Sequence, residues 1–158
     1  MKRLRNTFLI IGSVAIVAAI VFIICINATK SENNTGKGIK IEMNGLESIT
    51  LVNDKIGQGK LITKSDDIKA VCEIFNSTEM TIIENWKGQF ERDGGNSFTF
   101  QFNYKSGATR AVGYYDGSYL IEGSLAYDIH STEFEKFWNL NYPVQKWDYQ
   151  NNRFKLSE

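Results

Sequence analysis

Histidine, proline and cysteine are scarce in this sequence. Its 158 residues include one histidine, one proline and two cysteines. Because Cys25 lies inside an apolar run, His130 and Cys72 are the only soft ligands left for a zinc site, which needs more. Two cysteines also make no disulfide framework. We therefore expect no metal, no cofactor and no disulfide, and a domain stabilised by its apolar core.

An excess of charge of one sign is also missing. The chain carries 18 basic and 18 acidic residues. Lys2, Arg3 and Arg5 precede the apolar run, and the basic residues from Lys30 onwards are interspersed with acidic ones. A protein that binds nucleic acid needs a basic stripe that neutralises phosphates. We therefore expect no nucleic-acid partner.

No constellation of catalytic residues is recognisable. His130 has Asp128 nearby but no nucleophile to activate. Cys72 falls on the buried stripe of an expected helix, where a thiol is unreactive. Asp66 and Asp67 would point about 100° apart on that helix, so its dipole explains them better than a shared site. An enzyme is disfavoured, although a cell-envelope hydrolase or transferase that uses two distant carboxylates remains an alternative.

One long apolar run lies near the N-terminus. Residues 8–26 contain no charge, and as a helix they would be about 28 Å long, close to the thickness of a bilayer core. The basic residues before the run place the N-terminus in the cytoplasm. We predict a single-pass anchor over residues 1–28, with the rest outside the cell membrane. Two alternatives stay open: a cleaved signal peptide that releases a secreted protein, and a lipoprotein signal with lipid on Cys25.

The remaining residues divide into a tether, one domain and a tail. Residues 29–37 are small and polar without periodicity, which is typical of a flexible tether. Residues 38–142 carry helix and strand patterns and are expected to form one extracytoplasmic domain. Residues 143–158 form a C-terminal tail with Trp147, Tyr149 and Phe154, which either docks on the domain or stays loose.

The domain is expected to be α+β. Strict alternation predicts strands at residues 39–43 and 98–104, and Asp116-Gly117 predicts a tight hairpin. One helix is predicted by the apolar positions Ile68, Val71, Cys72 and Phe75, and a second, after Ser131, by Phe134, Phe137 and Trp138. Together with the transmembrane helix, this order predicts a small antiparallel sheet with two helices packed on one face.

The candidate ligand-binding residues are aromatic side chains of the expected sheet: Trp86, Tyr114, Tyr115, Tyr119 and Tyr127. Such side chains form a platform for a sugar or a peptide, but they also fill cores and cross-strand pairs. Tyr114 and Tyr115 are adjacent and face opposite sides of their strand. We expect any ligand surface to include the hairpin at residues 114–119. The opposing interpretation is that Tyr114 and Tyr119 simply pair across it.

Residues 119–129, Tyr-Leu-Ile-Glu-Gly-Ser-Leu-Ala-Tyr-Asp-Ile, follow the expected hairpin and lead into the second helix. This stretch resembles the ending of small uncharacterised exported domains of low-GC Gram-positive bacteria. The resemblance covers residues 38–140 in organisation; it implies export and transfers no functional residue. The predicted function is a membrane-anchored extracytoplasmic binding or interaction module with a protein or cell-wall partner. A regulatory subunit of another membrane protein is the alternative.

Overall fold

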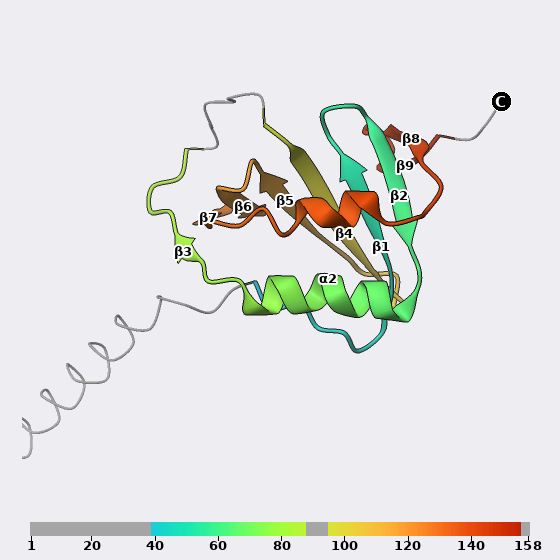
Figure 1. Ribbon diagram of the computed structural model, residues 1–158, viewed down its shortest axis with the longest axis horizontal. Helices are drawn as coiled ribbons and strands as arrows, with labels where there is room; N and C mark the ends of the chain where they lie inside the picture. Colours follow the sequence, from blue (N-terminus) through green and yellow to red (C-terminus); the bar gives the residue numbers. More distant parts are fainter. Residues whose placement is uncertain (1–38, 88–94, 156–158) are drawn as a thin grey trace, which may run out of the picture. The chain divides into compact units, whose positions relative to one another are not determined.

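The computed structural model describes residues 39–87 and 95–155. Their main feature is an antiparallel sheet of nine strands in the order β3-β7-β6-β5-β4-β1-β2-β8-β9 (Figure 1). In chain order the strands are β1 (Leu46–Asn53), β2 (Gln58–Ile62), β3 (Thr81–Ile82), β4 (Ser97–Tyr104), β5 (Thr109–Tyr115), β6 (Tyr119–Glu122), β7 (Leu125–Asp128), β8 (Gln145–Asp148) and β9 (Arg153–Phe154). The described helices are α2 (Ser65–Ser77) and the short 3-10 helix η1 (Glu135–Asn139).

The predicted fold class, a small antiparallel sheet with two helices packed on one face, is wrong. The sheet is large, and α2 is the one α-helix of the described residues. The second expected helix is only the five-residue η1, which ends where Leu140 becomes extended (φ −59°, ψ 142°). Phe134 and Phe137 repeat at i and i+3, which suits a 3-10 turn as well as an α-helix, and Pro143 limits further helical growth. So short a segment does not recover the cost of α-helix nucleation.

The predicted anchor at residues 1–28 and the tether at residues 29–37 lie outside the described residues. Within residues 39–87 and 95–155, no helix has the length and apolar character needed to cross a bilayer.

The central strand β4 has one apolar and one polar face. Phe98, Phe100 and Phe102 are buried, and the residues between them are Thr99 and Gln101. The predicted alternation is thus confirmed. β4 pairs with β1 on one side and with β5 on the other along nearly its whole length. Its two faces therefore set the character of the two sides of the sheet.

Phe75 of α2 lies at the centre of the core. It is fully buried, and its ring makes edge contacts with Phe100, Phe102 and Phe134 at centroid distances of 5.2, 5.3 and 4.8 Å. Phe134 directly precedes η1, and Phe137 within η1 contacts Phe100 at 6.3 Å. Both described helices therefore pack on the same side of β4, which we call the helix-covered face. The side that carries Thr99 and Gln101 is the helix-free face.

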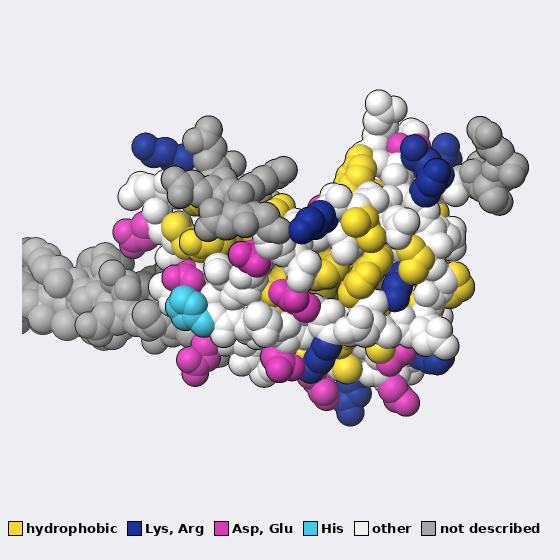
Figure 2. All heavy atoms as spheres, turned by 45° about the horizontal axis from the view of Figure 1, so that its top comes forward, with side chains coloured by type: hydrophobic (Ala, Val, Ile, Leu, Met, Phe, Trp, Pro, Cys, Tyr) yellow, Lys and Arg dark blue, Asp and Glu magenta, His cyan; other side chains and the backbone are white. Residues whose placement is uncertain are grey.

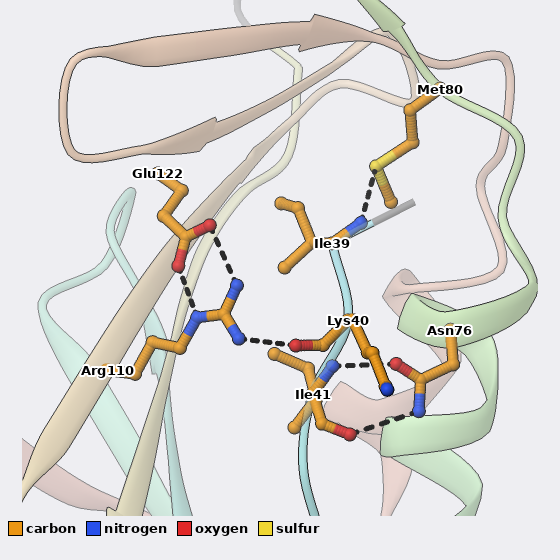
Figure 3. Close-up of polar contacts among 7 residues, drawn as sticks. All are labelled: Ile39, Lys40, Ile41, Asn76, Met80, Arg110 and Glu122. Atoms are coloured by element: carbon orange, nitrogen blue, oxygen red, sulfur yellow. Dashed lines mark hydrogen bonds and ion pairs between the residues drawn. The ribbon is translucent and has the colours of Figure 1, made fainter. Parts of the chain in front are cut away.

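Residues 39–41 also close the helix-covered face, but they do not form the predicted strand. Ile39 and Ile41 are buried. The side chain of Asn76 replaces a partner strand: its Oδ1 accepts from the N–H of Ile41 at 2.7 Å, and its Nδ2 donates to the Ile41 carbonyl at 3.1 Å (Figure 3). The N–H of Ile39 donates to Met80 Sδ at 3.3 Å. The main chain of this segment is thus satisfied by side chains rather than by a neighbouring strand.

The C-terminal strands β8 and β9 fold across one end of the helix-free face. β8 pairs with β2, and Trp147 of β8 packs edge-on against Phe154 of β9 at 5.1 Å. A Cβ placed on Gly59 would lie 3.0 Å from the Phe154 ring, so a larger residue here would require the ring to move by a few tenths of an ångström. Val52, which pairs with Gly59 on the same face, is 1% exposed. The β8–β9 hairpin therefore covers β1 and β2, whereas Ala111 of β5 is exposed on the same face.

Removing the ring of Phe75 should strongly destabilise the domain. We expect Phe75→Ala to lower the free energy of unfolding by about 3–5 kcal/mol, because three aromatic neighbours would line the cavity. Urea unfolding of the full-length protein, followed by circular dichroism, measures the change. Leu125→Ala, at an exposed position, is the control and should stay within about 0.5 kcal/mol. A similar loss in both variants would contradict the central position of Phe75.

The side chain of Asn76 should be needed for stability although the residue itself is exposed. Asn76→Ala leaves the N–H and C=O of buried Ile41 without their partners, which costs about 1–3 kcal/mol. Asn141→Ala, at another exposed asparagine, should change the free energy of unfolding by less than about 0.5 kcal/mol. Equal effects of the two substitutions would show that residues 39–41 do not depend on this contact.

Candidate functional site

The structure places Tyr114 in the core. Its side chain is fully buried on the helix-covered face, with centroid distances of 5.3 Å to Phe134 and 6.0 Å to Phe98. Its hydroxyl donates to Glu135 Oε1 at 2.9 Å. Burial, and then this hydrogen bond, raise the pKa of Tyr114 above its ordinary value. Tyr114 therefore joins β5 to η1 and cannot contact a ligand.

Tyr127 belongs to the same side of the sheet. Strand register connects Tyr114 with Leu120 and Leu120 with Tyr127, so all three side chains share the helix-covered face. Tyr127 is half-buried and packs against the core, and desolvation is the main cause of its raised pKa. The sheet separates Tyr127 from Tyr115 and Tyr119.

Tyr115 and Tyr119 lie on the helix-free face, where they form a direct cross-strand pair. The opposing interpretation, in which Tyr114 pairs with Tyr119, is therefore wrong in its partners. The reason is the turn: Asp116 and Gly117 have φ of 49° and 71°, and Ser118 adds one further residue to the loop. This third loop residue shifts the register by one position, which changes the face that each side chain occupies.

Tyr115, Tyr119 and Trp86 are the predicted residues that do not pack in the core. Tyr115 lies along its own strand over Gly113, where a Cβ would come within 2.9 Å of the tyrosine ring. Both tyrosines are half-buried. Trp86 follows β3 and is also half-buried. Of the five predicted residues, the sheet thus brings Tyr115 and Tyr119 together and places Tyr114 and Tyr127 on its other side.

Side-chain amides on this face are held by a chain of hydrogen bonds. Asn103 Nδ2 donates to Ser48 Oγ at 3.2 Å and to Thr50 Oγ1 at 3.1 Å. Gln101 Nε2 donates to Asn103 Oδ1 at 2.9 Å, and Asn152 of the β8–β9 hairpin donates to Gln101 Oε1 at 2.8 Å. Each amide therefore has a fixed orientation and keeps unused hydrogen-bonding capacity for a ligand.

A carboxylate borders the same face where β1 ends. Asp54 Oδ2 accepts hydrogen bonds from Ser97 Oγ at 3.2 Å and from Thr99 Oγ1 at 3.0 Å. The Tyr149 hydroxyl lies 3.4 Å from Asp54 Oδ1. Neither Asp54 nor the amides of Gln101 and Asn103 are among the residues predicted from the sequence, because polar residues that alternate along a strand are typical of any solvated face. Their strict alternation was the available signal.

Two further ionisable groups of the sheet, Arg110 and Glu122, have structural partners. Arg110 and Glu122 form a two-pronged ion pair across β5 and β6, and a third guanidinium N–H donates to the Lys40 carbonyl (Figure 3). Hydrogen bonding to Glu122 is the main cause of the raised pKa of Arg110. This pair, through Arg110, helps to hold the segment at residues 39–41.

Lys60 is a second cation on the helix-covered face. The residue is 7% exposed. Its Nζ donates to the carbonyl of Trp138 at 2.5 Å and to that of Leu140 at 2.8 Å. The ammonium also lies 4.9 Å from the centre of the Trp138 ring. Burial lowers the pKa of Lys60. Because these carbonyls belong to the end of η1, Lys60 acts as a cap for that helix.

The structure also shows the surroundings of the groups that metal-dependent or nucleophilic catalysis would use. Within residues 39–87 and 95–155, no three His, Cys, Asp or Glu side chains are grouped to hold a metal ion. His130 is exposed and lies 3.9 Å from Asp128. Burial raises the pKa of the Cys72 thiol to about 11, which makes it a poor nucleophile.

Comparisons with protein-family models, curated proteins and solved structures found no match. The predicted resemblance to exported bacterial domains therefore stays a prediction, and the candidate site depends on its own geometry.

The thiol of Cys72 should be unreactive in the folded protein. With a pKa of about 11, only about one part in a thousand is thiolate near pH 8. A Cys25→Ser variant isolates this thiol in the full chain. We expect negligible reaction with Ellman's reagent under native conditions and complete reaction in denaturant. Reaction of the native protein at the rate of free cysteine would show that Cys72 is accessible.

Proposed function

We propose that this protein is a binding module and that the ligand contacts the part of the helix-free face formed by β4, β5 and β6. The observation that carries this proposal is the ordered row of amide and hydroxyl side chains next to the Tyr115–Tyr119 pair. No described helix packs over this row, because α2 and η1 both lie on the other side.

The order of these side chains favours recognition. A surface glutamine or asparagine normally loses rotamer freedom when it binds, which weakens affinity. Here Gln101 and Asn103 are already held by neighbours on β1, β4 and the β8–β9 hairpin. A ligand would therefore meet oriented donors and acceptors at a reduced entropic cost.

The engagement of the ionisable groups supports binding over catalysis. Arg110 is paired with Glu122, and Lys60 is bound to carbonyls of the η1 end. The apolar run before the domain supports an extracytoplasmic location, with a cell-wall component or an envelope protein as the partner. The membrane attachment and its direction remain predictions from the sequence.

Blocking the face should abolish binding and leave the fold intact. Ala111 is exposed on this face beside Gln101 of β4, so Ala111→Phe adds bulk without entering the core. We expect the full-length variant to bind isolated cell-envelope material of the host at least about tenfold more weakly. Co-sedimentation measures binding, and the melting temperature should change by less than about 2 °C.

The matched control for this substitution is Asn139→Phe. Asn139 is exposed at the end of η1, on the other side of the sheet. It should bind like the unmodified protein. Unchanged binding by Ala111→Phe, or equal losses in both variants, would refute the helix-free face as the ligand site.

A further inference from the structure

We infer that the ligand of the helix-free face is an uncharged carbohydrate. This inference rests on the proposed function and adds the chemical class of the ligand. It follows from an inverted distribution of charge between the two faces of β4, β5 and β6.

These three strands carry no charge on the helix-free face. Side chains alternate between the two faces along each strand, and the register aligns the strands with one another. The residues that fall on the helix-free face have hydroxyl, amide, tyrosine or apolar side chains, or are glycine. The charged residues of the same strands are Arg110 and Glu122. Both lie on the helix-covered face, in phase with Phe102 and Leu120.

This arrangement is the reverse of an ordinary solvated sheet. Charged side chains are normally placed outward, because burying them is costly. The whole chain is 23% charged, and charges of both signs are interspersed on the side that carries the helices (Figure 2). There, Lys69 and Glu73 of α2 and Lys136 and Glu133 next to η1 form exposed ion pairs. An uncharged face on such a protein therefore indicates a neutral partner.

The charges that border the face argue against an anionic ligand. At one end of the face, Asp54 accepts hydrogen bonds from the hydroxyls of Ser97 and Thr99. Asp128 of β7 lies opposite Tyr119 on the same side of the sheet. Both would repel phosphate or carboxylate groups, whereas a carboxylate readily accepts hydrogen bonds from sugar hydroxyls.

The side chains present match a sugar better than a peptide strand. Amides and hydroxyls both donate and accept, as sugar hydroxyls do, and a tyrosine ring offers an apolar surface with one polar end. An extended peptide is recognised mainly through its backbone at an unpaired sheet edge. β4 and β5 have no such edge, because each is paired on both sides.

Titration of the full-length protein with defined probes tests the class of ligand. The neutral probes are cellohexaose and the hexamer of N-acetylglucosamine; the others are polyphosphate and an uncharged peptide of alternating serine and asparagine. We expect calorimetry to detect binding of a neutral oligosaccharide, with less than about a twofold change in affinity between low and high salt. Binding of polyphosphate or peptide alone, or of no probe, would overturn the inference.

A pair of charge substitutions at one position separates this inference from the proposed function. Ala111→Lys and Ala111→Asp should weaken binding of the oligosaccharide and of envelope material by similar factors of about fivefold or more, because either charge must be desolvated. An anionic ligand would bind the lysine variant more tightly and the aspartate variant more weakly. That result would overturn the carbohydrate inference but retain the face as the site.

Asn139→Lys and Asn139→Asp are the matched controls on the other side of the sheet. They should bind like the unmodified protein. If neither substitution at Ala111 affects binding of envelope material, the proposed function fails as well.

Discussion

The packing of Phe75 against β4 is the contact on which the rest of the domain depends, because it attaches one helix to a much wider sheet. α2 has 13 residues and is about 20 Å long, whereas the seven strands from β3 to β2 span about 29 Å. One helix cannot cover such an apolar face. The remaining cover comes from residues 39–41 and from Phe134 and Phe137 around η1, none of which is regular α-helix or strand.

Irregular cover explains why cations are found on the buried side of the sheet. A segment outside helices and strands leaves carbonyls without backbone partners, and buried carbonyls must be satisfied. Lys60 serves this purpose for the carbonyls of Trp138 and Leu140, and Arg110 donates to the more exposed carbonyl of Lys40. Asn76 supplies both a donor and an acceptor to Ile41. Polar side chains in this core therefore hold the irregular segments in place.

Local patterns predicted the parts of the fold that depend on neighbours in sequence. The stripe of α2, the alternation of β4 and the turn at Asp116-Gly117 are all present, with positive φ at both turn residues. The patterns failed where distant residues decide. Ile39 and Ile41 alternate like a strand, but their partners are the side chains of Asn76 and Met80. The pairing of β8 with β2 joins residues that no local pattern connects.

The candidate site was predictable only in part for the same reason. Aromatic type alone suggested the hairpin tyrosines, and the one-residue difference in the loop decided which of them share a face. Position along the strand held additional information: Tyr114 is in phase with Val112, whereas Tyr115 is in phase with Ala111 and Gly113. A bulky apolar residue indicates the core side, and small residues indicate the side that leaves room above the sheet.

The two faces of β4 connect stability with recognition. Phe98, Phe100 and Phe102 fix this strand against α2 and the η1 segment, and the residues between them must then point the other way. The positions of Thr99, Gln101 and Asn103 are therefore set by aromatic packing to which they contribute nothing themselves. Such side chains can be exchanged at little cost to the core, so their chemistry is open to selection for a ligand. These positions and their neighbours on β5 and β6 hold hydroxyls, amides and tyrosines but no charge. The fold does not require this absence of charge, and a neutral ligand accounts for it.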